Sequence, residues 1–173
     1  MKKFTLPFVI ILSLILSCCA TQHEPKDFFT LPISVSASLD GNGGQFSLDI
    51  SEKECTVTFG DTHALSGTTL YFAKDGNTAT VGDIFTRTIK NGTFPAQESL
   101  IKAIQLLAST ETVGINEGDK TRYTIDEMKI LVYYDENTDS ITRIETEEGG
   151  RRFAFVIASL ESHDTQSKSA GMP

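Results

Sequence analysis

The chain of 173 residues is poor in basic side chains and in cysteine. Lysine and arginine total 15 against 23 aspartates and glutamates, which gives a formal charge of −8. So few cations cannot build the basic face that a phosphate backbone requires, and we expect no nucleic-acid partner. Three cysteines are too few for a disulfide-rich scaffold. An apolar content of 39% is that of one globular domain.

Sequence motifs of enzymes and phosphate sites are missing as well. The chain has no G-x-S-x-G, H-E-x-x-H or C-x-x-C motif. The glycines within residues 41–44 are followed neither by a Lys-Ser/Thr pair nor by a helical pattern, and a phosphate-binding loop requires both. No nucleophile, base and orienting group are recognisable together. We therefore expect no catalytic residue and no cofactor, and we do not expect an enzyme.

Two short segments resemble parts of metal sites without completing them. Residues 135–139 have the D-x-N-x-D spacing of a calcium loop, but Ser140 and Thr146 stand where that loop needs glycine and glutamate. A solvated hairpin turn is the better interpretation. Asp61 and His63 are close in sequence but have no second histidine or cysteine nearby. We expect no metal.

The N-terminus has the pattern of a lipoprotein signal peptide. Lys2 and Lys3 precede an apolar run over residues 4–16, which is shorter than the roughly 20 apolar residues that cross a bilayer. The run ends in the tetrapeptide ILSC at residues 15–18, which resembles the bacterial lipobox. The resemblance implies that residues 1–17 are removed and that Cys18 carries diacylglycerol and a further acyl chain such as palmitate. Two or three acyl chains would hold the protein on the extracytoplasmic face of the cell membrane.

Two alternatives to this interpretation stay open. Cleavage before Cys19 would place Cys18 at the position that the lipobox reserves for a small residue. The segment would otherwise be an ordinary secretory signal with two incidental cysteines. Removal of residues 1–17 deletes two lysines and no acid, so the mature charge becomes 13 minus 23, or −10.

The remaining chain divides into three parts by composition. Residues 18–30 are polar and predict a tether, residues 31–160 carry the structural patterns, and residues 161–173 are polar and predict a disordered tail. We therefore expect one folded domain over residues 31–160.

Most of that domain alternates apolar and polar residues with a period of two, which is typical of β-strands with one wet face. The clearest alternations lie at residues 31–39, 46–51 and 55–59, and shorter ones at 70–73, 78–81, 84–89, 123–125, 128–132, 141–144 and 153–157. Cys55 falls on the apolar side of its strand and predicts a buried thiol. The last segment is apolar on both sides, so we expect it at the centre of the sheet with both faces covered.

One segment instead has the period of a helix. Apolar residues recur at helical spacing after Pro95, which is favourable in a first helical turn. A lone helix with an apolar stripe needs a partner, and the sheet is the only one available. We expect a mainly β, α+β fold: a curved antiparallel half-barrel of about 8–11 strands with one helix on its concave side. The stripe consists of Leu100, Ile101, Ile104, Leu107 and Ala108.

This order of elements resembles the small lipoproteins with a LolA-like half-barrel found in spore-forming Gram-positive bacteria. The similarity covers about residues 31–160 and is greatest at residues 46–50, at 57–59 leading into 65–70, in the helix after Pro95, and at 134–139. In that superfamily the sheet and helix enclose an apolar cavity that binds acyl chains, and some members dock a protein instead.

Two functions follow as expectations. In the first, the protein binds an apolar ligand or acyl chain between the sheet and the helical stripe defined above. In the second, the same surface is filled core, and the tethered domain is an adaptor for an envelope or spore protein. The adaptor would use an exposed strand edge or the charged residues around the turn at Gly149 and Gly150, from Glu145 to Arg152. Those charges have a simpler interpretation as cross-strand ion pairs, each worth less than about 1 kcal/mol.

Overall fold

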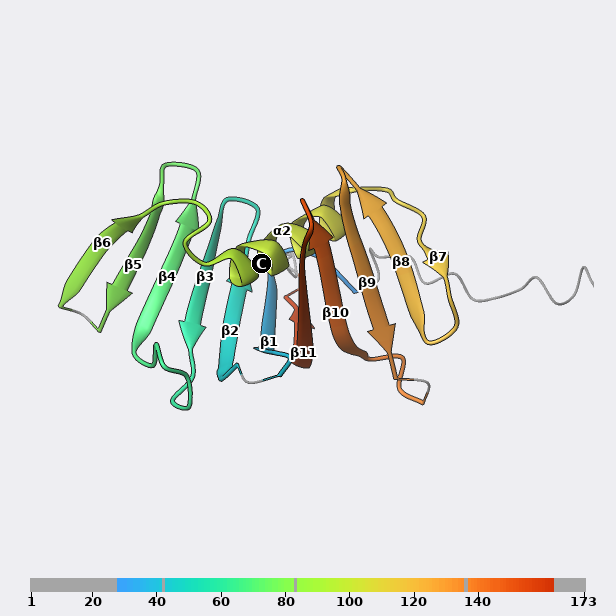
Figure 1. The fold of residues 1–173 in the computed structure, drawn as a ribbon, viewed down its shortest axis with the longest axis horizontal. Helices are drawn as coiled ribbons and strands as arrows, with labels where there is room; N and C mark the ends of the chain where they lie inside the picture. Colours follow the sequence, from blue (N-terminus) through green and yellow to red (C-terminus); the bar gives the residue numbers. More distant parts are fainter. Residues whose placement is uncertain (1–27, 42, 83, 136, 164–173) are drawn as a thin grey trace, which may run out of the picture.

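In the described part of the chain, eleven antiparallel strands form one curved sheet around a single helix (Figure 1). The computed structural model describes residues 28–41, 43–82, 84–135 and 137–163. The first six strands are β1 (Ile33–Leu39), β2 (Gln45–Ile50), β3 (Glu54–Phe59), β4 (Thr68–Ala73), β5 (Asn77–Val81) and β6 (Phe85–Ile89). The helix α2 (Pro95–Ser109) precedes β7 (Ile115–Asn116), β8 (Lys120–Ile125), β9 (Met128–Tyr134), β10 (Ile141–Glu148) and β11 (Arg151–Ser162). The strand count agrees with the expected 8–11.

The sheet consists of two meanders joined by one long-range pair. Strands β1 to β6 are consecutive neighbours, as are β7 to β11, and β1 pairs antiparallel with β11. That junction runs from the pair Ile33 and Ser162 to the pair Leu39 and Phe155, with a bulge after Ser36. The full order is β6-β5-β4-β3-β2-β1-β11-β10-β9-β8-β7. The first and last strands of the domain therefore meet in the middle of the sheet.

Tight turns set the register within each meander. The β4–β5 turn has Gly76 at a φ of 133°, a conformation that other residues rarely adopt. Asp126 and Glu127 link β8 to β9, and both have positive φ, at 47° and 67°. Two consecutive positive φ values are those of a type I′ turn, whose twist matches that of antiparallel strands. The short Asx and Gly turns recognised in the sequence thus become hairpins.

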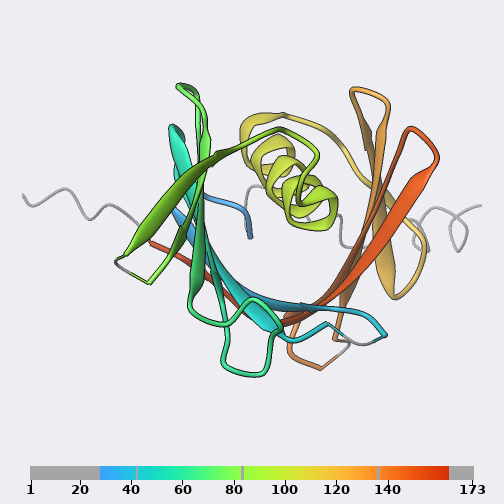
Figure 2. The same cartoon turned by 60° about the vertical axis from the view of Figure 1, so that its left-hand side comes forward.

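The helix lies inside the curve of the sheet, and Figure 2 shows it between the two rising halves. Its first turn is closed by Glu98, whose carboxylate accepts hydrogen bonds from the backbone amides of Gly92 at 2.6 Å and Phe94 at 3.1 Å. Leu100, Ile104 and Leu107 are fully buried against the sheet. The helical prediction is therefore confirmed, together with the concave position of the helix.

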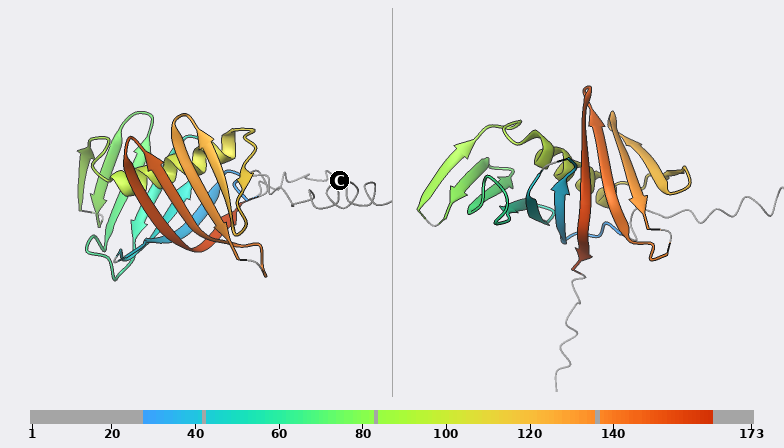
Figure 3. Two further views of the ribbon diagram at one scale, coloured as in Figure 1. Left: turned by 45° about the vertical axis from the view of Figure 1, so that its right-hand side comes forward. Right: turned by 60° about the horizontal axis from the view of Figure 1, so that its bottom comes forward.

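The helix crosses the middle strands and leaves β5 and β6 uncovered. Its closest strand neighbours are β2 and β10, while β4, β5 and β6 extend beyond it on one side (Figure 3). Side chains on β5 are half-exposed, and four of the five on β6 are exposed. The apolar core lies on the concave side of β1, β2, β3, β8, β9, β10 and β11, and β4 adds Leu70.

One expectation about the last strand is wrong. β11 does lie beside the centre of the sheet, but only its concave face is covered, because Phe155 and Ile157 are buried while Val156 is 44% exposed. No second layer packs on the convex face in the described part of the chain. The alanines and valine of β11 therefore face solvent in spite of their apolar character.

The folded body is longer than the expected residues 31–160. Phe29 is fully buried in the core, and β11 continues through Ser162 because it pairs with the start of β1. Cys18, the predicted signal peptide and most of the tether lie outside the described residues, as does the end of the predicted tail. Within the described residues, no helix is long and apolar enough to span a bilayer.

Truncation of a fully buried helical residue tests the packing of α2. We expect Leu107→Ala to lower the free energy of unfolding by about 2–5 kcal/mol, because it removes buried methyl groups and leaves a void. Urea denaturation of residues 24–173, which contain the whole sheet and helix, measures the change. Lys102→Ala on the exposed side of the helix is the control, and its surface pair with Glu148 predicts a loss below about 1 kcal/mol. Equal effects of the two substitutions would contradict this packing.

Candidate ligand pocket between the helix and the sheet

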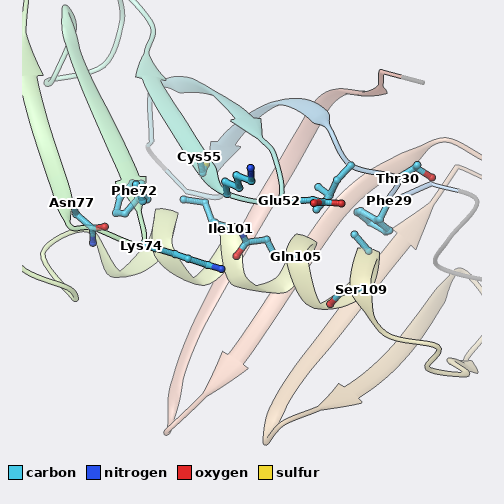
Figure 4. Close-up of a pocket in the computed structure, with 14 residues that line it drawn as sticks. Phe29, Thr30, Glu52, Cys55, Phe72, Lys74, Asn77, Ile101, Gln105 and Ser109 are labelled. Carbon is cyan, nitrogen blue, oxygen red and sulfur yellow. The ribbon is translucent and has the colours of Figure 1, made fainter. Parts of the chain in front are cut away.

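A pocket of about 830 Å³ opens between one side of α2 and the N-terminal half of the sheet (Figure 4). Four segments supply its walls: residues 29–31 before β1, the β2–β3 turn with the start of β3, the β4–β5 hairpin, and the C-terminal half of α2. The volume falls within the range of roughly 300–1,000 Å³ that small-molecule sites span. The lining residues are Phe29, Thr30, Leu31, Glu52, Lys53, Cys55, Phe72, Ala73, Lys74, Asn77, Ile101, Gln105, Ala108 and Ser109.

The structure divides the helical stripe that the sequence proposed as a ligand surface. Ile101 and Ala108 line the pocket. Leu100, Ile104 and Leu107 are fully buried in the core and do not line it. The stripe is thus solid core along its centre and pocket wall along one side. Gln105, on the polar side of the predicted helix, lies between these two lining residues in sequence and faces the pocket (Figure 4).

Buried apolar groups form the floor of the pocket. Phe29 and Cys55 are almost fully buried, and Phe72 on β4 is half-buried beside them. Burial, with a smaller contribution from the charge of Asp49, raises the pKa of the Cys55 thiol to about 12. The thiol is therefore neutral near pH 7, and it acts as a small apolar wall, as its place in the strand pattern predicted.

The rim of the pocket is polar and carries more positive than negative charge. Lys53 and Lys74 are exposed at the rim, and neither has an ion-pair partner among the described residues. Glu52 adds one carboxylate, and Asn77, Gln105 and Ser109 add neutral polar groups. An apolar floor with a few polar groups at its mouth is typical of sites for small organic ligands.

Sequence reasoning missed most of this site. The two lysines stand in separate turns, and the wall at Phe29 falls in the segment interpreted as tether. Cys55 is the one missed residue for which the sequence held a signal, because the alternation along β3 places its side chain toward the core. The others share no motif, because four segments far apart in sequence build the pocket.

A second candidate surface, the charged block on β10 and β11, is an internal ion-pair network. Glu145 is 5% exposed on the convex face and binds Arg143 at 2.9 Å and Arg152, while Arg143 also reaches Asp40 at 2.5 Å. Glu147 lies near Lys129, and Glu148 pairs with Lys102. These partners account for most charges of the block, which favours the interpretation as cross-strand ion pairs over that of a docking patch.

The network holds Glu145 in its charged form. Burial disfavours the carboxylate, but the hydrogen bonds and charges of Arg152 and Arg143 outweigh that effect, and the pKa of Glu145 is lowered. Its neighbours Ile144 and Thr146 point the other way, and the Thr146 hydroxyl lies 2.8 Å from that of Ser99 on the helix. Strand β10 therefore carries a charged cluster outside and a helix contact inside.

Two sequence-level metal candidates have structural roles in the fold. The carboxylate of Asp135 accepts hydrogen bonds from the amides of Asn137 at 2.9 Å and Thr138 at 3.0 Å, which lower the pKa of Asp135 and form a turn. The ring of His63 stacks on Phe59 with centroids 4.4 Å apart and accepts a hydrogen bond from the Leu65 amide. Both groups stabilise loops.

One polar constellation was invisible in the sequence. The hydroxyl of Ser34 on β1 lies 2.6 Å from the carboxylate of Asp49 and 2.9 Å from Nε2 of His163. Since Ser34 donates to Asp49, the histidine ring donates to the serine oxygen. A nucleophilic serine needs the reverse order, with its proton on a histidine that a carboxylate orients. The contact instead fastens the end of β11 to β1 and β2.

Comparisons with known proteins identify no family. No protein-family model matches the chain, and no curated protein matches it. The likeness to LolA-like lipoproteins thus stays a prediction from sequence, while the curved antiparallel sheet with one helix is the observed fold.

The charge on Glu145 predicts a pH-dependent stability. A folded pKa below the unfolded value of about 4.3 stabilises the protein above that pH, and the contribution is lost as pH falls through the folded pKa. We expect Glu145→Gln to lower the free energy of unfolding near pH 7 by about 1–3 kcal/mol. The difference from the unsubstituted protein should shrink towards pH 3, as measured by urea denaturation.

Glu147→Gln is the matched control for this experiment. It is the same substitution on the same strand, and Glu147 faces Lys129 across 3.8 Å in an exposed pair. Its effect should stay below about 1 kcal/mol. A difference between Glu145→Gln and the unsubstituted protein that does not change with pH would refute the role of the carboxylate charge.

Proposed function

We propose that this protein binds an apolar ligand, such as an acyl chain, in the pocket between α2 and β3–β5. The supporting observation is the pocket itself, which reaches about 830 Å³ beside a helix whose central residues Leu100, Ile104 and Leu107 are fully buried. Its floor consists of Phe29, Cys55, Phe72 and Ile101. Burial of apolar surface is worth about 25 cal/mol per Å², so an acyl chain would gain affinity from such a floor.

The proposal includes attachment to the outer face of the cell membrane through Cys18. Its support is the sequence pattern at residues 1–18 alone. The described chain starts at residue 28, and Phe29 is already a pocket wall. Phe28 follows Cys18 by ten positions, which span at most about 35 Å when extended. An anchored domain would therefore keep its pocket close to membrane lipids, the nearest source of acyl chains.

Native mass spectrometry, combined with a variant whose side chain fills the pocket, tests ligand binding. Residues 24–173, purified under native conditions or incubated with a bacterial lipid extract, should carry an extra mass in a native mass spectrum. That mass should leave on denaturation and extract into organic solvent. Ala108→Trp should abolish it, because the indole would occupy the pocket, while urea unfolding changes by less than about 1 kcal/mol.

Two further tryptophan variants serve as controls. The chain has no tryptophan of its own, so the fluorescence of each variant comes from the introduced residue. Ala158→Trp makes the same change on the exposed convex side of β11 and should keep the ligand. Ile104→Trp enters filled core and should destabilise the fold by about 1–3 kcal/mol or more. A bare mass before and after incubation with lipid would count against the binding function.

The anchor is tested separately. Cys18→Ala in the full chain should abolish acyl labelling of the protein and leave it unprocessed or released from the membrane, because no thiol remains for diacylglycerol. Cys19→Ala is the matched control and should change neither property. Unchanged membrane retention and acyl labelling in Cys18→Ala would overturn the lipobox assignment, without bearing on the pocket.

An adaptor that docks an envelope protein is the second candidate, and the exposed edge of the sheet favours it. Strand β6 pairs only with β5 in the described structure, and the hairpin between them exposes Val81 by 50%, Ile84 by 95% and Phe85 by 58%. An open apolar edge can receive a strand of another protein. A bare mass spectrum together with photo-crosslinking from position 84 to one envelope protein would support this function instead.

A further inference from the structure

The rim of the pocket points to a specific class of ligand. We propose that the pocket takes a single-chain amphiphile whose anionic head group binds between Lys53 and Lys74. This inference rests on the proposed function, because it assumes that the floor binds an apolar chain. It adds the head-group charge and the residues that select it.

The strand register brings the two lysines together at one end of the sheet. Glu54 on β3 pairs with Ala73 on β4. Lys53 and Lys74 are the next residues beyond that pair, each in the adjoining turn. Both line the pocket, and Lys74 extends across its mouth in the direction of Gln105 (Figure 4). Two ammonium groups therefore stand at the same opening although 20 residues separate them along the chain.

The charge balance at this opening is opposite to that of the protein. The chain has a net charge of −8, and Lys102 and Lys129 elsewhere lie in ion pairs. Among the residues that line the pocket, Lys53 and Lys74, which have no ion-pair partner in the described part of the chain, stand against one carboxylate, that of Glu52. A phosphate or carboxylate head would meet a local excess of positive charge and exchange water for charge-assisted hydrogen bonds.

The floor sets the orientation and the size of the ligand. A charged head cannot leave water for the apolar walls of Cys55, Phe72 and Ile101 without a large desolvation cost, so the head stays at the rim and the chain points inward. The core beneath the helix is filled by Leu100, Ile104 and Leu107. The pocket of about 830 Å³ lies along one side of the helix, and its size suits one acyl chain better than two or three.

A fluorescent fatty acid tests the charge selection. The probe is cis-parinaric acid, with its methyl ester as a neutral ligand of almost the same shape, titrated into residues 24–173. We expect the acid to bind more tightly than the ester, and added salt to weaken only the acid. The double variant Lys53→Gln/Lys74→Gln should weaken the acid about tenfold and leave the ester unchanged.

A second double variant controls for net charge. Lys120→Gln/Lys129→Gln removes the same charge from β8 and β9, away from the residues that line the pocket, and should leave both affinities unchanged. Charge reversal with Lys53→Glu/Lys74→Glu should instead favour an alkyltrimethylammonium probe over the fatty acid. Urea unfolding of each variant verifies that the fold is retained.

The outcomes separate this inference from the proposed function. Equal binding of acid and ester, unaffected by the lysine variants but abolished by Ala108→Trp, would overturn the anionic head group and keep the apolar site. An equal loss in both double variants would also overturn it, because net charge and not the rim would then govern binding. Failure of both probes to bind would overturn the inference together with the proposed function.

Discussion

The fold depends on one requirement, which is that the concave face of a long curved sheet must be covered. Among the described residues, one helix of 15 residues does this for eleven strands. It seals the middle of the sheet, where Leu100, Ile104 and Leu107 lose all contact with water, and burial of such side chains is the main favourable contribution to folding. It does not also cover β5 and β6, whose side chains stay at least partly exposed. The pocket lies where this cover ends, on the side of β3 to β5.

The convex face must instead tolerate contact with water, because no layer of the described chain covers it. Polar side chains alternate outward along most strands, and the network of Glu145 with Arg143 and Arg152 lies across β10 and β11, next to the junction with β1. Both arginines bind the same carboxylate, that of the buried Glu145. The charges of this network are thus ion-paired with one another. Lys53 and Lys74 at the pocket rim have no ion-pair partner among the described residues.

The position of the N-terminal segment connects the pocket with the proposed anchor. Phe29 is a core residue and a pocket wall at once, so the segment that would lead to a lipidated Cys18 begins at the wall of the pocket. A ligand that enters or leaves beside Phe29 would pass the segment nearest the membrane. The amphipathic character inferred for the ligand fits this arrangement, because such molecules partition between a bilayer and an apolar pocket with a charged rim.

The sequence by itself determined most of the strands, their turns and the helix, because alternation, glycine and Asx turns, and helical spacing act over a few neighbouring residues. It also gave the inward direction of Cys55 and the apolar stripe of α2. It did not indicate the two-residue strand β7. Only the tertiary structure decided that Phe29 belongs to the core, that the convex side of β11 stays wet, and that Ile101 and Ala108 face open space while Ile104 does not. Those outcomes depend on contacts between segments far apart in the chain, such as the pairing of β1 with β11 across more than 100 residues. No local pattern encodes contacts over such a separation.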